Sequence, residues 1–160
     1  MRYYQDSLAG KTALITGAGR GIGKAIALAY AAEGAEIVCL SRTETELNET
    51  VRLIEESGGA AIGIPCDISD RSQVESAVAK AVERFGKIDI LLLNAGVNIA
   101  PQVLGEEDPD LWVKTIEINL IGQYYCLRAC VPHFKKAGFG NVISIGSGRG
   151  RRGASGGSAR

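Results

Sequence analysis

The sequence predicts an α/β fold in three layers, with a doubly wound parallel sheet between two layers of helices. Five short apolar runs alternate with amphipathic helical segments along the chain. The strand-like runs have the apolar composition of strands that are buried on both faces. Parallel neighbours need crossover connections, and helical crossovers cover both faces of a sheet. We therefore expect one domain over residues 1–160.

The first half of the chain contains three strand and helix pairs. The strands are expected at Thr12–Thr16, Glu36–Leu40 and Ala60–Cys66. A helix over Gly21–Glu33 follows the first strand, and Gly34 stops it. The helix after the second strand begins with a capping box formed by Thr43 and Glu46 and ends at the two glycines at 58–59.

The second half continues the alternation. The last two strands are expected at Ile88–Leu93 and Asn141–Ile145. Asp70 caps the helix before them, and Gly86 stops that helix in a left-handed conformation. A long helix from about Asp110 to Lys136 lies between the two strands, and Pro132 should kink its last turns. Residues 146–160, rich in Gly, Ser and Arg, are expected to form a loop or a flexible tail.

Composition and charge favour a small-molecule partner. The 18 basic and 18 acidic residues give a formal net charge of zero, so the chain as a whole would not attract nucleic acid or an anionic membrane. No apolar signal segment or membrane span is evident, which favours a cytoplasmic protein. The four cysteines and the single histidine are not spaced as metal ligands, so no metal site is predicted.

A glycine-rich turn follows the first predicted strand. The segment 16–23 reads TGAGRGIG, which fits G-x-x-x-G-x-G and not the commoner G-x-G-x-x-G spelling. Because glycines have no side chains, the backbone N–H groups of the turn and the start of the next helix can approach a pyrophosphate. The candidate cofactor-binding residues of this turn are Gly17, Arg20, Gly21, Ile22 and Gly23. The turn predicts a Rossmann-type, NAD(P)-binding sheet, and a tight strand–helix connection without a ligand is the alternative.

The residues after the second strand bear on the choice of cofactor. Where an acidic residue would bind the ribose 2′-hydroxyl of NAD, the chain has Ser41 and Arg42. Arg42 and Arg20 can together pair with the 2′-phosphate of NADP, because guanidinium groups match phosphate in geometry and charge. NADP(H) is therefore favoured over NAD(H). In the alternative, Arg42 is a solvated surface charge and Glu44 turns back to the ribose.

Two more strand ends carry small or polar residues that suit an adenine and a ribose. These candidate cofactor-binding residues are Asp67 and Ile68 after the third strand, and Asn94, Ala95 and Gly96 after the fourth. Ligands of open α/β sheets bind at the carboxyl ends of the strands, where all of these residues are expected. Taken alone, Asp67 could be an acidic loop residue without a ligand, and the segment 94–96 could be an ordinary turn. Together with the glycine turn they predict one binding site.

The segments TGAGRGIG, CD, LNAG, IEINLIG and NVISIGS, in this order, resemble the single-domain branch of the short-chain dehydrogenase/reductase family. The likeness covers residues 8–160. It implies an oxidoreductase that reduces a carbonyl or oxidises a secondary alcohol, similar to a 3-oxoacyl-carrier-protein reductase. It also implies a homodimer or homotetramer that pairs through the long helix. Leu93 departs from the family, which often has a second Asn there, and this change should leave the nicotinamide-ribose site intact.

The same resemblance implies two catalytic residues. By motif position, Ser147 would hydrogen-bond the substrate carbonyl, and Asn119 in the long helix would complete a proton relay. Ser144 is the alternative serine, although strand alternation places it within the sheet. For Asn119 the alternative is an asparagine that faces solvent from the helix.

The family's Tyr-x-x-x-Lys motif does not occur in this sequence. By its spacing from Ser147 in the family, the tyrosine would fall at or just beyond Arg160, the last residue. We therefore expect an enzyme whose sequence is incomplete at its carboxyl end and which is inactive in this form. The alternative is a non-catalytic dinucleotide-binding module.

Overall fold

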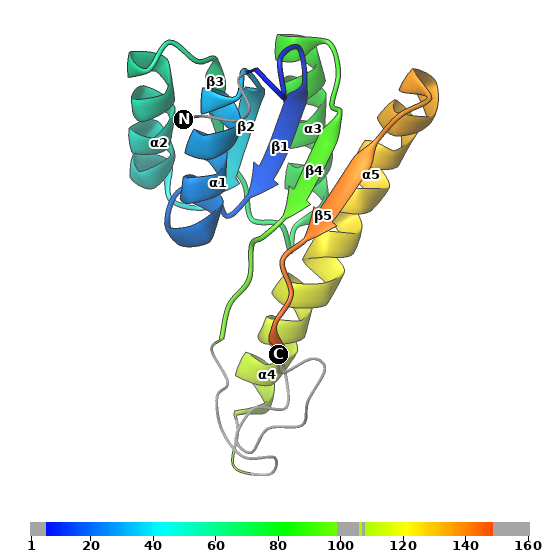
Figure 1. Cartoon of the computed structure of the whole chain (residues 1–160). Coiled ribbons are helices and arrows are strands. Elements are labelled where there is room, and N and C mark those ends of the chain that lie inside the picture. The colour runs from blue at the N-terminus through cyan, green and yellow to red at the C-terminus, as the bar shows by residue number, and fades with distance from the viewer. Residues whose placement is uncertain (1–5, 99–105, 107, 149–160) are drawn as a thin grey trace.

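The structure is a computed structural model that describes residues 6–98, 106 and 108–148. Its centre is a five-stranded sheet with the order β3-β2-β1-β4-β5 (Figure 1). The strands are β1 (Thr12–Thr16), β2 (Glu36–Ser41), β3 (Ala61–Pro65), β4 (Ile90–Leu93) and β5 (Asn141–Ser144). All four neighbouring pairs are parallel. The prediction of a doubly wound parallel sheet is confirmed.

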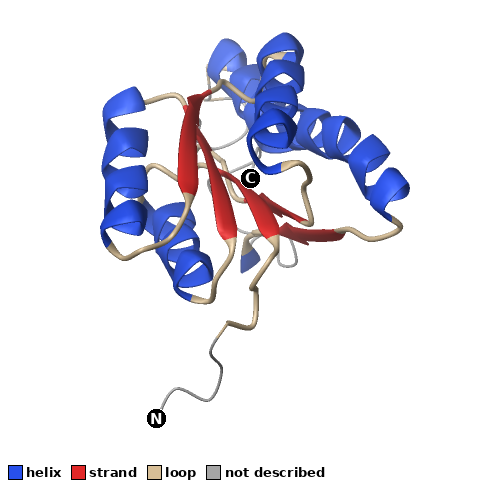
Figure 2. Ribbon diagram, turned by 90° about the horizontal axis from the view of Figure 1, so that it is seen from above, coloured by secondary structure: helices blue, strands red, loops and turns tan. Residues whose placement is uncertain are grey.

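Helices cover both faces of the sheet, as Figure 2 shows in a view from above. The helices are α1 (Gly21–Ala32), α2 (Glu44–Glu56), α3 (Arg71–Phe85), α4 (Pro109–Ile116), the π-helix η1 (Glu117–Gly122) and α5 (Gln123–Ala137). One core cluster joins one face of the sheet to α1 and α2, and a second joins the other face to α3 and α5. The three predicted layers are therefore present.

Strand alternation explains the two separate clusters. In β1, Leu14 lies in the cluster with α3 and α5, whereas Ala13 and Ile15 lie in the cluster with α1 and α2. Every residue of β1 and β4 is buried. The edge strands β3 and β5 are partly exposed, so the prediction of burial on both faces holds for the central strands and not for the edges.

The two predicted helix caps have different outcomes. The Asp70 carboxylate accepts hydrogen bonds from the backbone N–H groups of Ser72 (2.8 Å) and Gln73 (3.2 Å), so the predicted cap of α3 is confirmed. The predicted capping box at Thr43 is wrong. Thr43 immediately precedes α2, but its side chain makes no capping hydrogen bond. The Glu46 side chain lies beside Arg20 instead.

The long predicted helix is present but differs in its irregular part. Pro132 lies inside α5, which continues to Ala137, so the proline does not break the helix. The departure from α-helical geometry is η1, ten residues upstream. There Gly122 packs closely on the loop after β3, where a Cβ atom would lie 2.9 Å from the backbone oxygen of Ile68.

The last two strands are shorter than predicted at one end each. Asp89 was expected inside the fourth strand, but it lies just before β4 with its carboxylate buried. Residues 146–148 follow β5 without strand structure, and the rest of the predicted tail lies outside the described residues. None of the described helices combines the length and the apolar composition that crossing a membrane requires.

Candidate functional site

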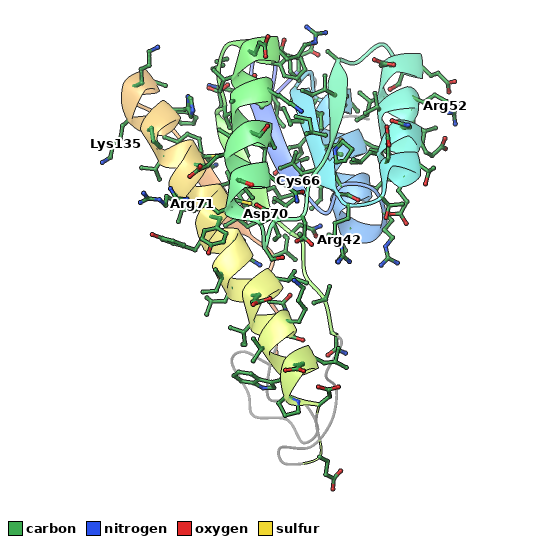
Figure 3. All side chains as sticks on the ribbon, turned by 180° about the vertical axis from the view of Figure 1, so that it is seen from behind. Arg42, Arg52, Cys66, Asp70, Arg71 and Lys135 are labelled. Carbon is green, nitrogen blue, oxygen red and sulfur yellow. The ribbon has the colours of Figure 1, made fainter. Side chains whose placement is uncertain are left out.

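A cleft of about 270 Å³ lies at the carboxyl ends of the strands. Its walls come from the segments that follow β1, β2, β3 and β4, together with Ile118 of η1. Figure 3 shows Arg42 and Asp70 at this end of the sheet, and Lys135 at the opposite end. This is the end at which open α/β sheets bind ligands.

Most of the predicted cofactor-binding residues line this cleft. They are Gly17, Arg20, Ser41, Arg42, Asp67, Ile68, Asn94, Ala95 and Gly96. The other three lie in the first turn of α1 and do not line it: Gly21, Ile22 and Gly23. Sequence reasoning did not single out other lining residues, which are Gly19, Leu40, Thr43, Glu46, Cys66, Val97 and Ile118. Gly19 belongs to the predicted glycine turn, whereas the other six carried no separate signal for a ligand.

The glycine turn packs closely on itself and on the segment after β4, which leaves no room for side chains at Gly17 and Gly23. Gly17 has φ +68°, and a Cβ atom there would lie 2.9 Å from Nδ2 of Asn94. A Cβ atom on Gly23 would lie 2.2 Å from the backbone oxygen of Gly17. The first turn of α1 contains no acidic residue, and Arg20 before it makes no side-chain cap. The positive end of α1 therefore follows directly after Gly17, Gly19 and Arg20, which line the cleft, and a helix N-terminus of this kind can bind an anion.

Thr16 joins the ends of β1 and β4. Its buried hydroxyl accepts hydrogen bonds from the backbone N–H groups of Asn94 and Ala95, both at 2.9 Å, and donates to the Leu92 oxygen at 3.3 Å. The Asn94 side chain donates in return to the backbone oxygens of Thr16 (2.9 Å) and Gly17 (3.3 Å). These bonds fix the glycine turn relative to the segment after β4. Thr16 was not among the predicted site residues, although a threonine beside the glycine turn was a usable signal.

Asp67 is held in its charged form at the floor of the cleft. Burial raises the pKa of its carboxyl group, but hydrogen bonds from Ser69 and the positive charges of Lys114 and Arg42 outweigh burial, so the pKa lies below its usual range. Its Oδ1 atom accepts from the Ser69 backbone N–H (2.9 Å) and hydroxyl (2.7 Å). A carboxylate held in this way can accept a further hydrogen bond from the amino group of a bound base.

Two cations and a carboxylate line the part of the cleft formed by the glycine turn, the end of β2 and the start of α2. Arg20 and Arg42 both line the cleft, and Nε of Arg20 lies 3.8 Å from Oε1 of Glu46. Glu44, the acid that we considered as a ribose ligand, does not line the cleft. Glu46 is the acidic residue of α2 that does. This part of the site is therefore mixed in charge.

Asn119 fixes the loop that follows β4. Its Nδ2 donates to the Val97 oxygen and its Oδ1 accepts from the Val97 N–H, both at 2.8 Å. The alternative of a solvent-facing asparagine is therefore wrong. Neither Asn119 nor Ser147 lines the cleft itself. Ser144 pairs with Leu93 within the sheet, as strand alternation predicted, whereas Ser147 is exposed beyond the end of β5.

The cysteines are poorly suited to nucleophilic chemistry. Burial raises the pKa of the thiols of Cys39, Cys126 and Cys130 to about 12. Cys66 lines the cleft, but burial, followed by the charges of Asp67 and Asp70, raises its pKa to about 11. A thiol with such a pKa is protonated at neutral pH. Within the described part of the chain, no group of three or more His, Cys, Asp or Glu side chains is placed to hold a metal ion.

Comparison with known proteins relates this chain to a protein family. The family model for short chain dehydrogenases matches residues 11–159. The short-chain reductase protein NovJ of Streptomyces niveus is 42% identical over 135 residues, which are 84% of this chain and 51% of that protein. The chain spans about half the length of the curated relatives that it matches.

Two solved structures share the fold. The structure of NAD⁺-bound xylitol dehydrogenase superimposes with a TM-score of 0.93 at 31% identity, covering 96% of this chain and 59% of that one. A 3-ketoacyl-ACP reductase from Sinorhizobium meliloti 1021 gives a TM-score of 0.83 at 42% identity, covering 85% and 53%.

Proposed function

Because the chain belongs to the short-chain dehydrogenase family, we propose that it is the cofactor-binding part of an NADP(H)-dependent oxidoreductase. The substrate would be a small carbonyl compound or the corresponding secondary alcohol. The choice of NADP(H) rests on the position of Arg42, which lines the cleft directly after β2. Arg20, from the glycine turn, lines the cleft as well. Two guanidinium groups at this position can neutralise a 2′-phosphate and hydrogen-bond to it.

Each part of the cleft would hold a different part of the cofactor. The turn between Gly17 and Gly23, with the positive end of α1, would bind the pyrophosphate. Asp67 and Ile68 would contact the adenine, and the segment 94–96 would contact the nicotinamide ribose. The bound cofactor would supply or accept the hydride.

The chain's own polar groups would serve the substrate carbonyl. Ser147, close after β5, would donate a hydrogen bond to the carbonyl oxygen and so stabilise the negative charge that develops there. Asn119 would keep its place in η1 through the two bonds to Val97. We expect the proton donor to be the tyrosine of a Tyr-x-x-x-Lys motif, which this sequence does not contain. Without that donor, residues 1–160 would bind the cofactor but would catalyse carbonyl reduction only very slowly.

The names of two similar proteins support a carbonyl substrate: a short-chain reductase and a 3-ketoacyl-ACP reductase. Self-association would use the helical face that α4, η1 and α5 expose, where Leu111, Val113, Leu120 and Tyr124 are uncovered. We place the protein in the cytoplasm, where its four free cysteines would stay reduced.

Cofactor titration tests this proposal. We expect the protein to bind NADPH more tightly than NADH, because hydrogen bonds between charged groups and the 2′-phosphate contribute about 1.5 to 3 kcal/mol each. Arg42→Asp should reverse the preference, as measured by quenching of protein fluorescence. Arg84→Asp is the matched control, because it makes the same change of charge at the far end of α3. Equal affinities of the unaltered protein for the two cofactors would refute the assignment.

A further inference from the structure

Glu46 is an acidic residue in the part of the cleft between the glycine turn and the end of β2. It belongs to the first turn of α2 and lines the cleft beside Ser41 and Arg42. A Cβ atom built on Gly19 would lie 3.1 Å from Oε2 of Glu46 and 3.1 Å from Oγ of Ser41. The carboxylate and the Ser41 hydroxyl therefore share one small space over the glycine turn.

The backbone beneath this carboxylate is fixed. Thr50 is fully buried, and its hydroxyl lies within hydrogen-bonding distance of three backbone oxygens, those of Ala18 (3.1 Å), Gly19 (3.3 Å) and Glu46 (3.1 Å). This threonine joins α2 to the glycine turn. The backbone of Glu46 consequently keeps its position relative to the turn, and its carboxylate lies within reach of a ligand bound there.

The ion pair between Arg20 and Glu46 is weak. The atoms Nε and Oε1 are 3.8 Å apart, and the side chains are 85% and 37% exposed. Exposed pairs of this kind contribute little stability, so Arg20 is able to leave Glu46 for a phosphate group. The Glu46 carboxylate would then remain beside that phosphate without its partner.

A 2′-phosphate and a 2′-hydroxyl experience this carboxylate differently. A phosphate monoester carries close to two negative charges at neutral pH, so the carboxylate repels it. A ribose hydroxyl is a donor, and the carboxylate accepts a hydrogen bond from it. From these contacts we propose that Glu46 is a specificity-determining residue, which weakens binding of the 2′-phosphate and thereby lowers the preference for NADP(H) over NAD(H). The proposal rests on the proposed function, because it assumes that the adenosine ribose lies beside Ser41.

Two nucleotide fragments separate the effect of Glu46 from catalysis. The dissociation constants of the protein for 2′,5′-ADP and 5′-AMP are measured by calorimetry. The readout is the constant for 5′-AMP divided by the constant for 2′,5′-ADP, so a larger ratio means a stronger preference for 2′,5′-ADP. We expect Glu46→Gln to increase the preference for 2′,5′-ADP by about tenfold at low salt, because it removes one charge near the phosphate, and by less at high salt. Glu44→Gln is the matched control, because it removes the same charge from the same turn outside the cleft.

The outcomes distinguish this inference from the proposed function. If Glu46→Gln leaves the ratio unchanged or lowers it, or if Glu44→Gln raises it equally, Glu46 does not determine specificity, whatever the unaltered protein prefers. If the unaltered protein prefers 5′-AMP, the proposed choice of NADP(H) fails, but a tenfold rise in Glu46→Gln still supports the role of Glu46. If neither fragment binds, both proposals are wrong. Unfolding midpoints of the variants show that the fold is intact in each comparison.

Discussion

Asp89 is a buried carboxylate at the end of the sheet opposite the cleft. Its Oδ2 atom accepts a hydrogen bond from the Thr12 N–H at 2.9 Å and pairs with Nζ of Lys87 at 2.9 Å, and Lys11 lies 3.8 Å from Oδ1. Burial raises the pKa of this carboxyl group, but the Thr12 hydrogen bond and the two lysines outweigh burial, so the pKa lies below its usual range. Asp89 thus joins the starts of β1 and β4.

Asp89→Asn should lower the free energy of unfolding at pH 7 by about 1 to 3 kcal/mol, because it removes the charge from a buried acceptor that the Thr12 N–H and two lysines contact. The folded-state pKa is lower than that of the unfolded chain, about 4, so the carboxylate stabilises the fold above that pH. This stability is lost as the pH falls through the folded-state pKa. Urea unfolding at pH 7 and pH 3 should therefore show a smaller difference between variant and unaltered protein at pH 3.

The control for Asp89 is Glu49→Gln. The pKa of Glu49 is also lowered, chiefly by its hydrogen bond with Arg52, but the group is fully exposed to solvent. We expect little change in stability at either pH, because exposed ion pairs contribute little. A destabilisation by Asp89→Asn that is as large at pH 3 as at pH 7 would contradict the electrostatic account.

At the residue scale, the sequence predicted which segments form the site better than how they are joined. Arg42, Asp67 and Asn94 were expected from their places after strands, and all three line the cleft. The bonds of Thr16 to the segment after β4 were not predictable, because they depend on the distance between residues that are 78 and 79 positions apart. The position of Glu46 was mistaken for a capping box, since the spacing of Thr43 and Glu46 fits both arrangements.

At the scale of elements, the connection from β1 to α1 depends on two glycines for different reasons. Gly21 has φ +57°, but a Cβ atom there would meet no other atom within 4 Å. Gly23 has an ordinary φ, but its Cβ atom would lie 2.2 Å from the Gly17 oxygen. The first position needs conformational freedom, whereas the second needs empty space.

We expect Gly23→Ala to damage the turn more than Gly21→Ala. Gly21→Ala should cost only the backbone strain of a left-handed residue, about 1 to 2 kcal/mol. Gly23→Ala must also displace the backbone of Gly17, so that both the stability of the fold and the affinity for 2′,5′-ADP should fall. Urea unfolding and nucleotide titration of the two variants measure this difference. If both variants lose the same stability and the same affinity, the close approach of Gly23 to Gly17 contributes nothing beyond backbone strain.

The positions of the elements were predictable from the period of apolar residues, and their irregularities were not. All five strands and the helices lie within a few residues of their predicted ranges. Local sequence predicted a kink at Pro132 and gave no sign of η1, the π-helical segment ten residues upstream. A π-helix there accompanies the packing of Gly122 against Ile68, which is a tertiary contact without a local sequence signal.

At the scale of the molecule, the sheet is unequally covered. The central strands β1 and β4 are fully buried, whereas β5 is exposed along most of its length, with Val142 41% exposed. The glycine turn and the segment 94–96 therefore follow the two fully buried strands, whereas Asp67 and Ile68 follow the edge strand β3. Ser147 is exposed and follows the edge strand β5 by three residues.

Cofactor binding and turnover should depend on different groups of this protein. In a protein that joins residues 1–160 to a Tyr-x-x-x-Lys motif, Ser147→Ala should lower kcat by roughly 10² to 10³ and leave the affinity for NADPH unchanged, because one donor to the developing oxyanion is lost. Ketone-dependent oxidation of NADPH measures the turnover. Ser57→Ala is the control, because this hydroxyl bonds the Ile54 oxygen at the end of α2. Residues 1–160 alone should bind NADPH without turnover, since a serine does not readily release a proton near neutral pH. Equal rates with and without the motif would show that the proton comes from another group.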